Sequence, residues 1–298
     1  MVRPATRIGV WVQAMRPKTL PAAIAPVVVA SALAWHDGCF NFAAATLCLL
    51  FGVLIQIGTN FANDYYDFIK GADTANRVGP TRAVATGLVT PAAMHRAMLL
   101  VLITAFLLGL TLIYWGGPWL ILIGILSVVC AVAYTGGPYP LGYNGLGDLF
   151  VFLFFGLVAV GATYYVQAGT ITPDAVALAV PIGLLAANIL LVNNYRDVET
   201  DRVAGKRTTV VRFGQAYARV QFTVTLLIAF GVLITRNLLG GSAWELLPLL
   251  LAPMAWRQRG RLQHSKTPSE LIRLLGDTGK LLALYALLLS LGLILSPS

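Results

Sequence analysis

Charged residues are scarce in this sequence, and their scarcity excludes an ordinary soluble domain. Only 11% of the 298 residues are charged and 58% are hydrophobic, whereas soluble domains average about 25% charged and about 45–50% apolar residues. Apolar runs close to the roughly 20 residues that a membrane-spanning helix needs recur along the whole chain with short polar gaps. We therefore expect an integral membrane protein folded as one helical bundle.

Cysteine and histidine are also scarce, which argues against a disulfide framework and against a zinc site. The three cysteines, Cys39, Cys48 and Cys130, stand singly, without CxxC or paired spacing. The three histidines are equally scattered, and none stands at ligand spacing from a Cys, a Glu or another His. We interpret the cysteines as small buried residues and assign no chemistry to the histidines.

Nine apolar segments are read as membrane spans, and the eighth is the shortest. The chain is therefore predicted to be all-α, a multi-pass transmembrane bundle of nine helices. The first run contains Ala32-Leu33-Ala34, which imitates a signal-peptide cleavage site, but the stretch before it is long for a signal peptide and we expect no cleavage. The predicted spans are residues 19–36, 42–63, 94–115, 119–134, 146–166, 173–194, 220–236, 243–256 and 279–295.

Basic residues are distributed unevenly between the two sides of this bundle. With nine spans, all but Arg236 of the 21 Lys and Arg residues fall on the side of the N-terminus. Because membrane insertion leaves Lys and Arg mainly in cytoplasmic loops, the N-terminus is predicted to be cytoplasmic. The net charge of +9 fits attraction to anionic membrane lipid and also a surface that holds a polyanionic ligand, and charge alone does not separate the two.

Six of the twelve acidic residues lie in two short segments at the predicted cytoplasmic ends of the second and sixth spans. The segments are 60–73, NFANDYYDFIKGAD, and 193–201, NNYRDVETD, and both have Asn, Tyr and Asp at alternate positions. Since the two spans run in the same direction, the repeat is parallel, and its two half-sites can face each other across one cavity. We expect a single domain, residues 1–298, made of two parallel four-helix halves and a final helix.

The carboxylates of these segments are spaced to share a ligand. On a helix, Asp64 and Asp67 are three residues apart and point to one side. The same holds for Asp197 and Asp201, which are four apart. Asp73 follows in a loop and is expected to fold back toward the same ion. Carboxylates and Asn carbonyls without Cys or His suit Mg²⁺, which proteins usually hold by few carboxylates together with substrate phosphates.

Basic residues follow each acidic segment, with Arg77 and Arg82 after the first and Lys206 and Arg207 after the second. Magnesium that bridges two diphosphate oxygens, with Arg and Lys on the remaining oxygens, is the usual way to hold a diphosphate. Polar helix ends flanked by topogenic charge would explain one such segment, but membrane-level carboxylates are costly and usually functional, and the pattern occurs twice. A diphosphate site above apolar helices suits a charged head with a long hydrocarbon tail, as in a polyprenyl diphosphate.

The two acidic segments resemble the paired Asp-rich motifs of the UbiA superfamily of intramembrane aromatic prenyltransferases, and the similarity extends over nearly the whole chain. Within the superfamily, the branch that prenylates 1,4-dihydroxy-2-naphthoate in menaquinone synthesis is the most similar. Many members space the first motif as NDxxDxxxD, whereas this chain has Gly71 at the last Asp and places Asp73 two residues later, as that branch does. The stretches that support the resemblance are 16–21 RPKTLP, 63–67 NDYYD, 77–82 RVGPTR, 134–143 YTGGPYPLGY and 145–148 GLGD.

The resemblance implies Mg²⁺-dependent transfer of a polyprenyl group from polyprenyl diphosphate to 1,4-dihydroxy-2-naphthoate. The acceptor loses its carboxyl group, which gives demethylmenaquinone. It also implies a UbiA-like fold in the cell membrane with the active site on the cytoplasmic side, surrounded by membrane lipid, and no nucleic-acid partner is expected. The residues that it implies are Asp64, Asp67, Asp73, Asp197 and Asp201 for the metal, with Asp67 and Asp197 catalytic, and Asn63, Arg77, Arg82, Lys206 and Arg207 for the substrate.

The loop 136–147 is rich in Gly and Pro and is incompatible with a helix. We interpret it as a cap over the site, with Tyr139 and Tyr143 as substrate contacts, and a plain connector is the alternative. Two other functions stay open. One is a transferase of the same superfamily with another aromatic acceptor, such as 4-hydroxybenzoate. The other is a cation or metabolite transporter, which is less favoured because transporters tend to place ionisable residues near the midplane on broken helices, often in inverted repeats.

Overall fold

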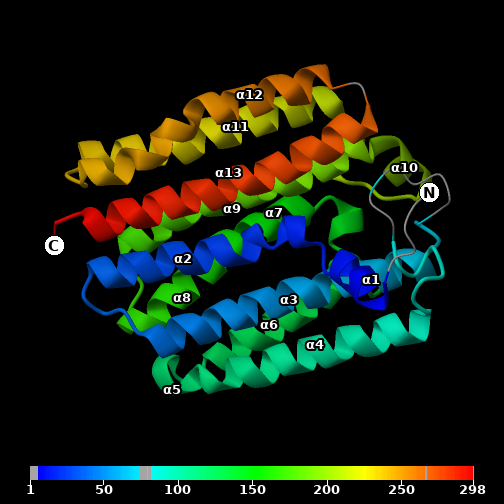
Figure 1. The fold of residues 1–298 in the computed structure, drawn as a ribbon, viewed down its shortest axis with the longest axis horizontal. Helices are drawn as coiled ribbons and strands as arrows, with labels where there is room; N and C mark the ends of the chain where they lie inside the picture. Colours follow the sequence, from blue (N-terminus) through cyan, green and yellow to red (C-terminus); the bar gives the residue numbers. More distant parts are fainter. Residues whose placement is uncertain (1–5, 74–78, 80–81, 266, 298) are drawn as a thin grey trace.

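Long apolar helices run side by side along the longest axis of the molecule (Figure 1). The computed structural model describes residues 6–73, 79, 82–265 and 267–297, and within them all regular secondary structure is helical. In chain order the elements are α1 (Arg7–Ala14), η1 (Pro17–Thr19), α2 (Pro21–His36), α3 (Phe42–Ile69), α4 (Pro91–Thr111), α5 (Ile113–Gly116), α6 (Leu120–Ala133), η2 (Gly142–Asn144), α7 (Gly147–Val151), η3 (Phe152–Val158), α8 (Ala159–Ala168), α9 (Pro173–Arg196), α10 (Val198–Val203), α11 (Thr209–Leu238), η4 (Ala243–Leu251), α12 (Ala252–His264) and α13 (Pro268–Leu295).

The helices confirm the all-α class and an integral membrane protein. By length and hydropathy, 6 helical stretches of the described chain can cross a membrane, or 7 if the pair Arg7–Thr19 and Pro21–His36, bent by 53°, counts as one span. Each of the nine predicted spans overlaps described helices. However, α6 is too short to be counted as a span by length, and the eighth predicted span overlaps α12, which is strongly basic. The number of nine spans therefore stays a prediction.

Several helices extend beyond the predicted spans at the end of the bundle where α10 lies (Figure 1). Helix α3 continues to Ile69, whereas its span was predicted to end at residue 63, and α11 begins at Thr209 rather than at residue 220. Hydrophobicity marks only the part of a helix that lies in lipid, while the backbone hydrogen bonds continue for as long as the chain stays helical. The extension of α3 has the consequence that Asp64 and Asp67 both lie on the helix itself.

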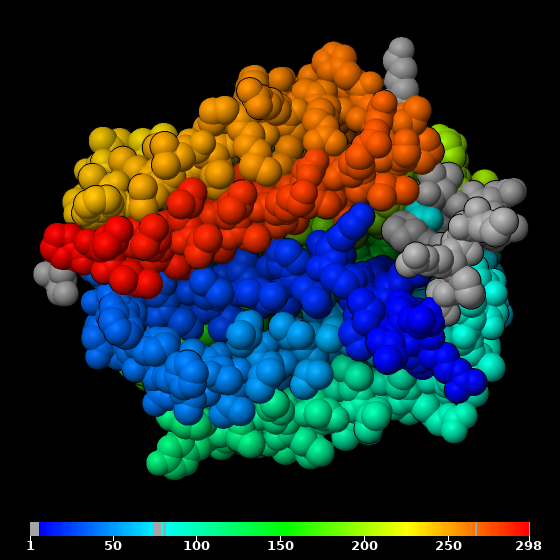
Figure 2. Space-filling model, in the orientation of Figure 1, coloured from blue at the N-terminus to red at the C-terminus, as the bar shows by residue number. Residues whose placement is uncertain are grey.

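Helix α9 forms the centre of the bundle. Of its most apolar 18-residue window, 72% is buried, compared with 22% for α3 and for the α4–α5 stretch. It packs against α11, α13 and η3, and α13 in turn lies along α2, as the red and blue segments show in the space-filling view (Figure 2). The main apolar core therefore forms around α9, which fixes the position of the acidic segment at its end.

Candidate functional site

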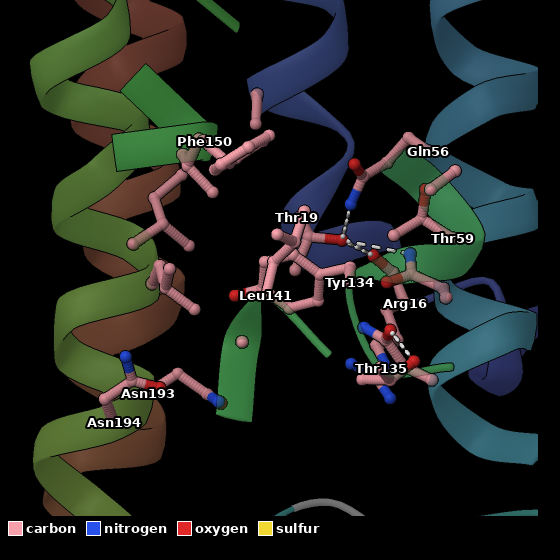
Figure 3. A pocket seen from close by; sticks show the side chains of 18 of the residues that line it. Arg16, Thr19, Gln56, Thr59, Tyr134, Thr135, Leu141, Phe150, Asn193 and Asn194 are labelled. Atoms are coloured by element: carbon pink, nitrogen blue, oxygen red, sulfur yellow. Dashed lines mark hydrogen bonds between the residues drawn. The ribbon is translucent and has the colours of Figure 1, made fainter. Parts of the chain in front are cut away.

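A cavity of about 210 Å³ lies between α3 and α9, at the end of the bundle where both acidic segments lie. In Figure 3, Asn193 and Asn194 on α9 face Gln56 and Thr59 on α3, with Tyr134 and Leu141 between them. Part of the polar lining comes from both acidic segments and from the basic residues that follow them, and this part includes Asn63, Asp67, Arg82, Asn193, Asn194, Asp197, Asp201 and Lys206. Phenylalanine and aliphatic side chains of η3, α7 and α9 form much of the remaining wall.

Asp67 lies in this cavity and accepts hydrogen bonds from three side chains. Its Oδ2 accepts a hydrogen bond from Arg82 Nη2 at 2.8 Å, while its Oδ1 accepts one from Lys206 Nζ at 3.0 Å and one from the Tyr143 hydroxyl at 2.7 Å. Only 1% of Asp67 is exposed. A buried carboxylate requires compensating charge and hydrogen bonds, and here one cation follows the first acidic segment and the other comes from a distant part of the chain. Lys206 follows the second acidic segment, so this contact joins the two segments.

The loop predicted to be a cap contributes Tyr143 to the same cluster. Burial, together with the adjacent Asp67 carboxylate, raises the pKa of the Tyr143 hydroxyl well above its usual value, so it stays a hydrogen-bond donor at neutral pH. Lys70 and Lys206 lie over its ring at 4.9 and 4.7 Å from the centroid, within the range of a cation–π interaction. The loop is fixed because the backbone N–H of Arg207 donates to the Tyr143 carbonyl at 2.7 Å.

The second acidic segment has a local neutralising partner. The Arg196 guanidinium donates to both oxygens of Asp197, at 2.7 Å from Nε and 2.6 Å from Nη2, in the bidentate geometry that gives strong pairs. Arg196 Nη2 also donates to the Oδ1 of Asn193 at 2.8 Å. Asp201 lines the same cavity on α10, so Asp197 and Asp201 are brought together there with Asp67.

Four of the predicted site residues lie outside the cavity lining, and one lies outside the described residues. The oxygens of Asp64 accept the backbone N–H groups of Ala83 and Val84, at 3.1 and 3.3 Å, and thereby hold the loop that positions Arg82. Asp73 forms an ion pair with Arg82 Nε at 3.4 Å. The side chains of Tyr139 and Arg207 are exposed, and the one predicted residue that falls outside the described part is Arg77.

The donor atoms around the cavity fit a magnesium ion. Carboxylate oxygens of Asp67, Asp197 and Asp201, together with neighbouring Asn side chains, are the hard oxygen ligands that Mg²⁺ prefers. Within the described residues, no group of three or more His, Cys, Asp or Glu side chains is close enough to hold a metal by itself. The arrangement therefore suits an ion that completes its ligands with substrate phosphates and water, as magnesium commonly does.

Sequence reasoning missed Arg16 as a site residue, although it lies in a stretch that supports the resemblance. Arg16 lines the cavity at the bend between α1 and η1, and its φ of 51° makes it the only residue other than glycine with positive φ in the described chain. Asn60 on α3 holds this bend, because its amide donates to the Met15 carbonyl at 2.9 Å. Strained backbone of this kind is concentrated at functional sites. However, the sequence gives no signal for a left-handed backbone conformation at an arginine.

Comparisons with known proteins show the family of the chain. The sequence profile described as the UbiA prenyltransferase family matches residues 23–275. The 1,4-dihydroxy-2-naphthoate octaprenyltransferase of Escherichia coli (strain K12) is 38% identical over 298 residues, which cover 98% of this chain and 97% of that protein. The enzyme of the same name from Mycobacterium tuberculosis is 42% identical over 278 residues, covering 93% of this chain and 94% of its own length.

A solved structure supports the fold. A UbiA homolog from Archaeoglobus fulgidus, bound to GPP and Mg²⁺, superposes with a TM-score of 0.66 over 94% of this chain and 99% of its own, at 17% sequence identity. At that identity the likeness supports the fold alone.

Proposed function

Because the chain belongs to the UbiA prenyltransferase family, we propose that it transfers a polyprenyl group from polyprenyl diphosphate to 1,4-dihydroxy-2-naphthoate. The observation that carries the proposal is the meeting of Asp67, Asp197 and Lys206 in one cavity whose inner wall is apolar. This combination provides for a charged diphosphate and for a hydrocarbon chain in the same place. The relatives of that name, at 38% and 42% identity over nearly their whole length, point to the acceptor.

In this proposal the diphosphate lies between the two acidic segments. Arg82 and Lys206, which are held on Asp67 at 2.8 and 3.0 Å, turn to the diphosphate oxygens, and Asp67, Asp197 and Asp201 are the residues that would hold magnesium. The chemistry that magnesium supplies there is neutralisation of the charge that develops on the leaving diphosphate. Once they contact the diphosphate, the two cations add to that stabilisation. The neighbouring Asp64 and Asp73 position the loop of Arg82.

The proposed reaction needs no further reactant, because each bond that forms is matched by a bond that breaks. The bond between the allylic carbon and the diphosphate oxygen breaks, and its electron pair leaves with the diphosphate. The ring carbon of the acceptor that bears the carboxyl group attacks the allylic carbon. The carboxylate then leaves this ring carbon as carbon dioxide, and its electron pair returns to the ring. Tyr143 and the loop that bears it close the cavity beside Asp67, which helps to keep water away from the cationic carbon.

We also propose the orientation that the basic residues predicted. The two acidic segments and the basic residues after them face the cytoplasm, the N-terminus is cytoplasmic, nine helices form two parallel halves and a final helix, and the protein resides in the cell membrane. A cysteine-accessibility experiment on intact cells tests this. Cysteines placed at the exposed Arg202 and Leu239 are expected to react from the cytoplasmic and the outer side respectively. Equal reaction of both from one side would contradict the orientation.

A transfer assay tests the proposed reaction and distinguishes between the two acceptors. The purified protein in detergent with Mg²⁺ receives a labelled prenyl diphosphate and either 1,4-dihydroxy-2-naphthoate or 4-hydroxybenzoate. We expect a prenylated product from the naphthoate alone. Product from the benzoate alone would move the chain to another branch of the family. Metal-dependent flux in liposomes without product from either acceptor would favour a transporter.

A further inference from the structure

A second cavity of about 120 Å³ lies beside the first and has a different character. Its lining comes from α2, α3, α6, η3 and α8 and from the end of α4 with the residue after it, and no charged residue lines it among those that the structure describes. The few polar side chains are those of Cys48, Ser127 and Thr163. A ligand with hydroxyl or carboxylate groups would lose hydrogen bonds there, since unpaired polar groups are costly to bury. The chemistry of this cavity suits a hydrocarbon.

The second cavity continues the first, away from the acidic segments. Four residues, Ile55, Ser127, Phe154 and Phe155, line both cavities. Along α3, residues from Asp67 back to Ile55 line the first cavity, and residues from Ile55 back to Cys48 line the second. At 1.5 Å per residue, the distance along α3 from Asp67 to Cys48 is about 28 Å, so a long chain anchored at the acidic end can extend through both cavities.

The partition between the cavities comes largely from a break in helical regularity. Phe152–Val158 forms a π-helical segment between α7 and α8, and such segments are rare and frequently lie at functional sites. In a regular α-helix adjacent side chains diverge by about 100°, yet the neighbours Phe154 and Phe155 both line both cavities. The backbone of this segment is fixed, because a Cβ on Gly156 would lie 2.9 Å from Gly183 Cα on α9. The aromatic rings are therefore the parts that can open the passage.

We propose that the second cavity binds the distal isoprene units of the donor, and that the partition formed by Ser127, Phe154 and Phe155 determines how long a donor chain the enzyme uses. The inference rests on the proposed function and adds a specificity site that is separate from the diphosphate site. Short donors fill the first cavity alone. Long donors displace the aromatic rings and fill both cavities.

The test is a comparison of kcat/KM for a short donor, geranyl diphosphate, and a long donor, octaprenyl diphosphate. Gly124 lines the second cavity only, and a Cβ there would lie 3.4 Å from its nearest neighbour, Phe106, so Gly124→Leu fills the space. We expect it to lower kcat/KM for the long donor about ten-fold or more, the scale on which apolar pockets discriminate. We expect kcat/KM for the short donor to change less than about two-fold. The matched control is Val129→Leu, on the exposed side of the same helix.

A second variant guards against a folding defect in the first. Phe155→Ala opens the partition and is expected to raise the ratio of kcat/KM for the long donor over the short donor. A ratio that stays unchanged in both variants, or that shifts equally in Val129→Leu, would overturn the inference while transfer itself continued. Absence of transfer from either donor in the unsubstituted protein would instead overturn the proposed function, and this inference with it.

Discussion

The two acidic segments have the same order of Asn, Tyr and Asp, but the structure neutralises them differently. Asp67 is bonded by Arg82 and Lys206, which are 15 and 139 residues away. Asp197 is bonded by Arg196, the residue directly before it. The first carboxylate therefore depends on the folded arrangement of both halves of the chain, whereas the second has its partner on its own helix.

This difference separates cations that can reach the substrate from one that holds a carboxylate in place. Arg82 and Lys206 line the cavity, while Arg196 does not line it and has a side chain only 1% exposed. We infer that Arg82 and Lys206 exchange Asp67 for diphosphate during turnover, and that Arg196 stays on Asp197 as a positioning residue.

The largest expected effect comes from the carboxylates themselves. Asp67→Asn and Asp197→Asn each remove a ligand charge, and both should lower Mg²⁺-dependent kcat about 10³-fold or more, the upper range for losing one stabilising group at a developing charge. Steady-state transfer assays measure this. The matched control is Glu199→Gln in the second segment, since its side chain is 76% exposed. Full turnover in either Asp variant would refute the shared site.

The next largest effect is expected at Lys206, one of the two cations that can reach the substrate. Lys206→Gln is expected to lower kcat/KM for the donor about 10²-fold because one charge no longer reaches the diphosphate. Arg207→Gln, at the next position but exposed and outside the cavity lining, should change it less than about two-fold. Equal losses in both variants would mean that the segment contributes only general positive charge.

Arg196 should matter more for stability than for donor binding. Arg196→Gln leaves Asp197 buried without its cation, and breaking a buried pair costs about 3–5 kcal/mol. We expect a clearly lower thermal unfolding midpoint in detergent, followed by tryptophan fluorescence, with KM for the donor nearly unchanged. Arg202→Gln, which breaks an exposed pair with Glu199, is the control and should leave the midpoint in place. A higher donor KM at an unchanged midpoint would make Arg196 a substrate ligand instead.

The smallest effect concerns the cap. Tyr143→Phe removes one of three hydrogen bonds to Asp67, and the loss of about 0.5–1.5 kcal/mol corresponds to a roughly three- to ten-fold lower kcat/KM. Tyr139→Phe, on the same loop but exposed, should have no effect. If Tyr139→Phe lowers kcat/KM as much as Tyr143→Phe does, the loop acts as a whole rather than through Tyr143.

The sequence was sufficient to predict the all-helical class and several of the polar residues that line the cavity. Hydrophobic runs fixed the course of α3 and α9, and the repeated motif at their ends predicted that Asp67 and Asp197 would line one cavity. Hydropathy did not show where helices extend out of the lipid. Helix α3 therefore continues to Ile69, and α11 begins at Thr209, outside the apolar runs that predicted the spans.

The remaining features depend on packing between distant segments. The spacing placed Asp64 beside Asp67 on one side of the helix, but the backbone amides of Ala83 and Val84 hold Asp64 against the following loop. The left-handed backbone of Arg16 and the π-helical segment around Phe154 are conformations that the residue types at these positions do not predict. The second cavity is defined by the side chains of several helices together.

Metal binding tests most directly whether the two acidic segments form one site. Mn²⁺, as a paramagnetic substitute for Mg²⁺, is titrated into the purified protein with and without a non-reactive thiolodiphosphate analogue of the donor, and free Mn²⁺ is followed by electron paramagnetic resonance. We predict that the analogue strengthens Mn²⁺ binding and that Asp67→Asn and Asp197→Asn each weaken it about ten-fold or more. Mn²⁺ binding that is indifferent to the analogue and unchanged in both variants would contradict the account.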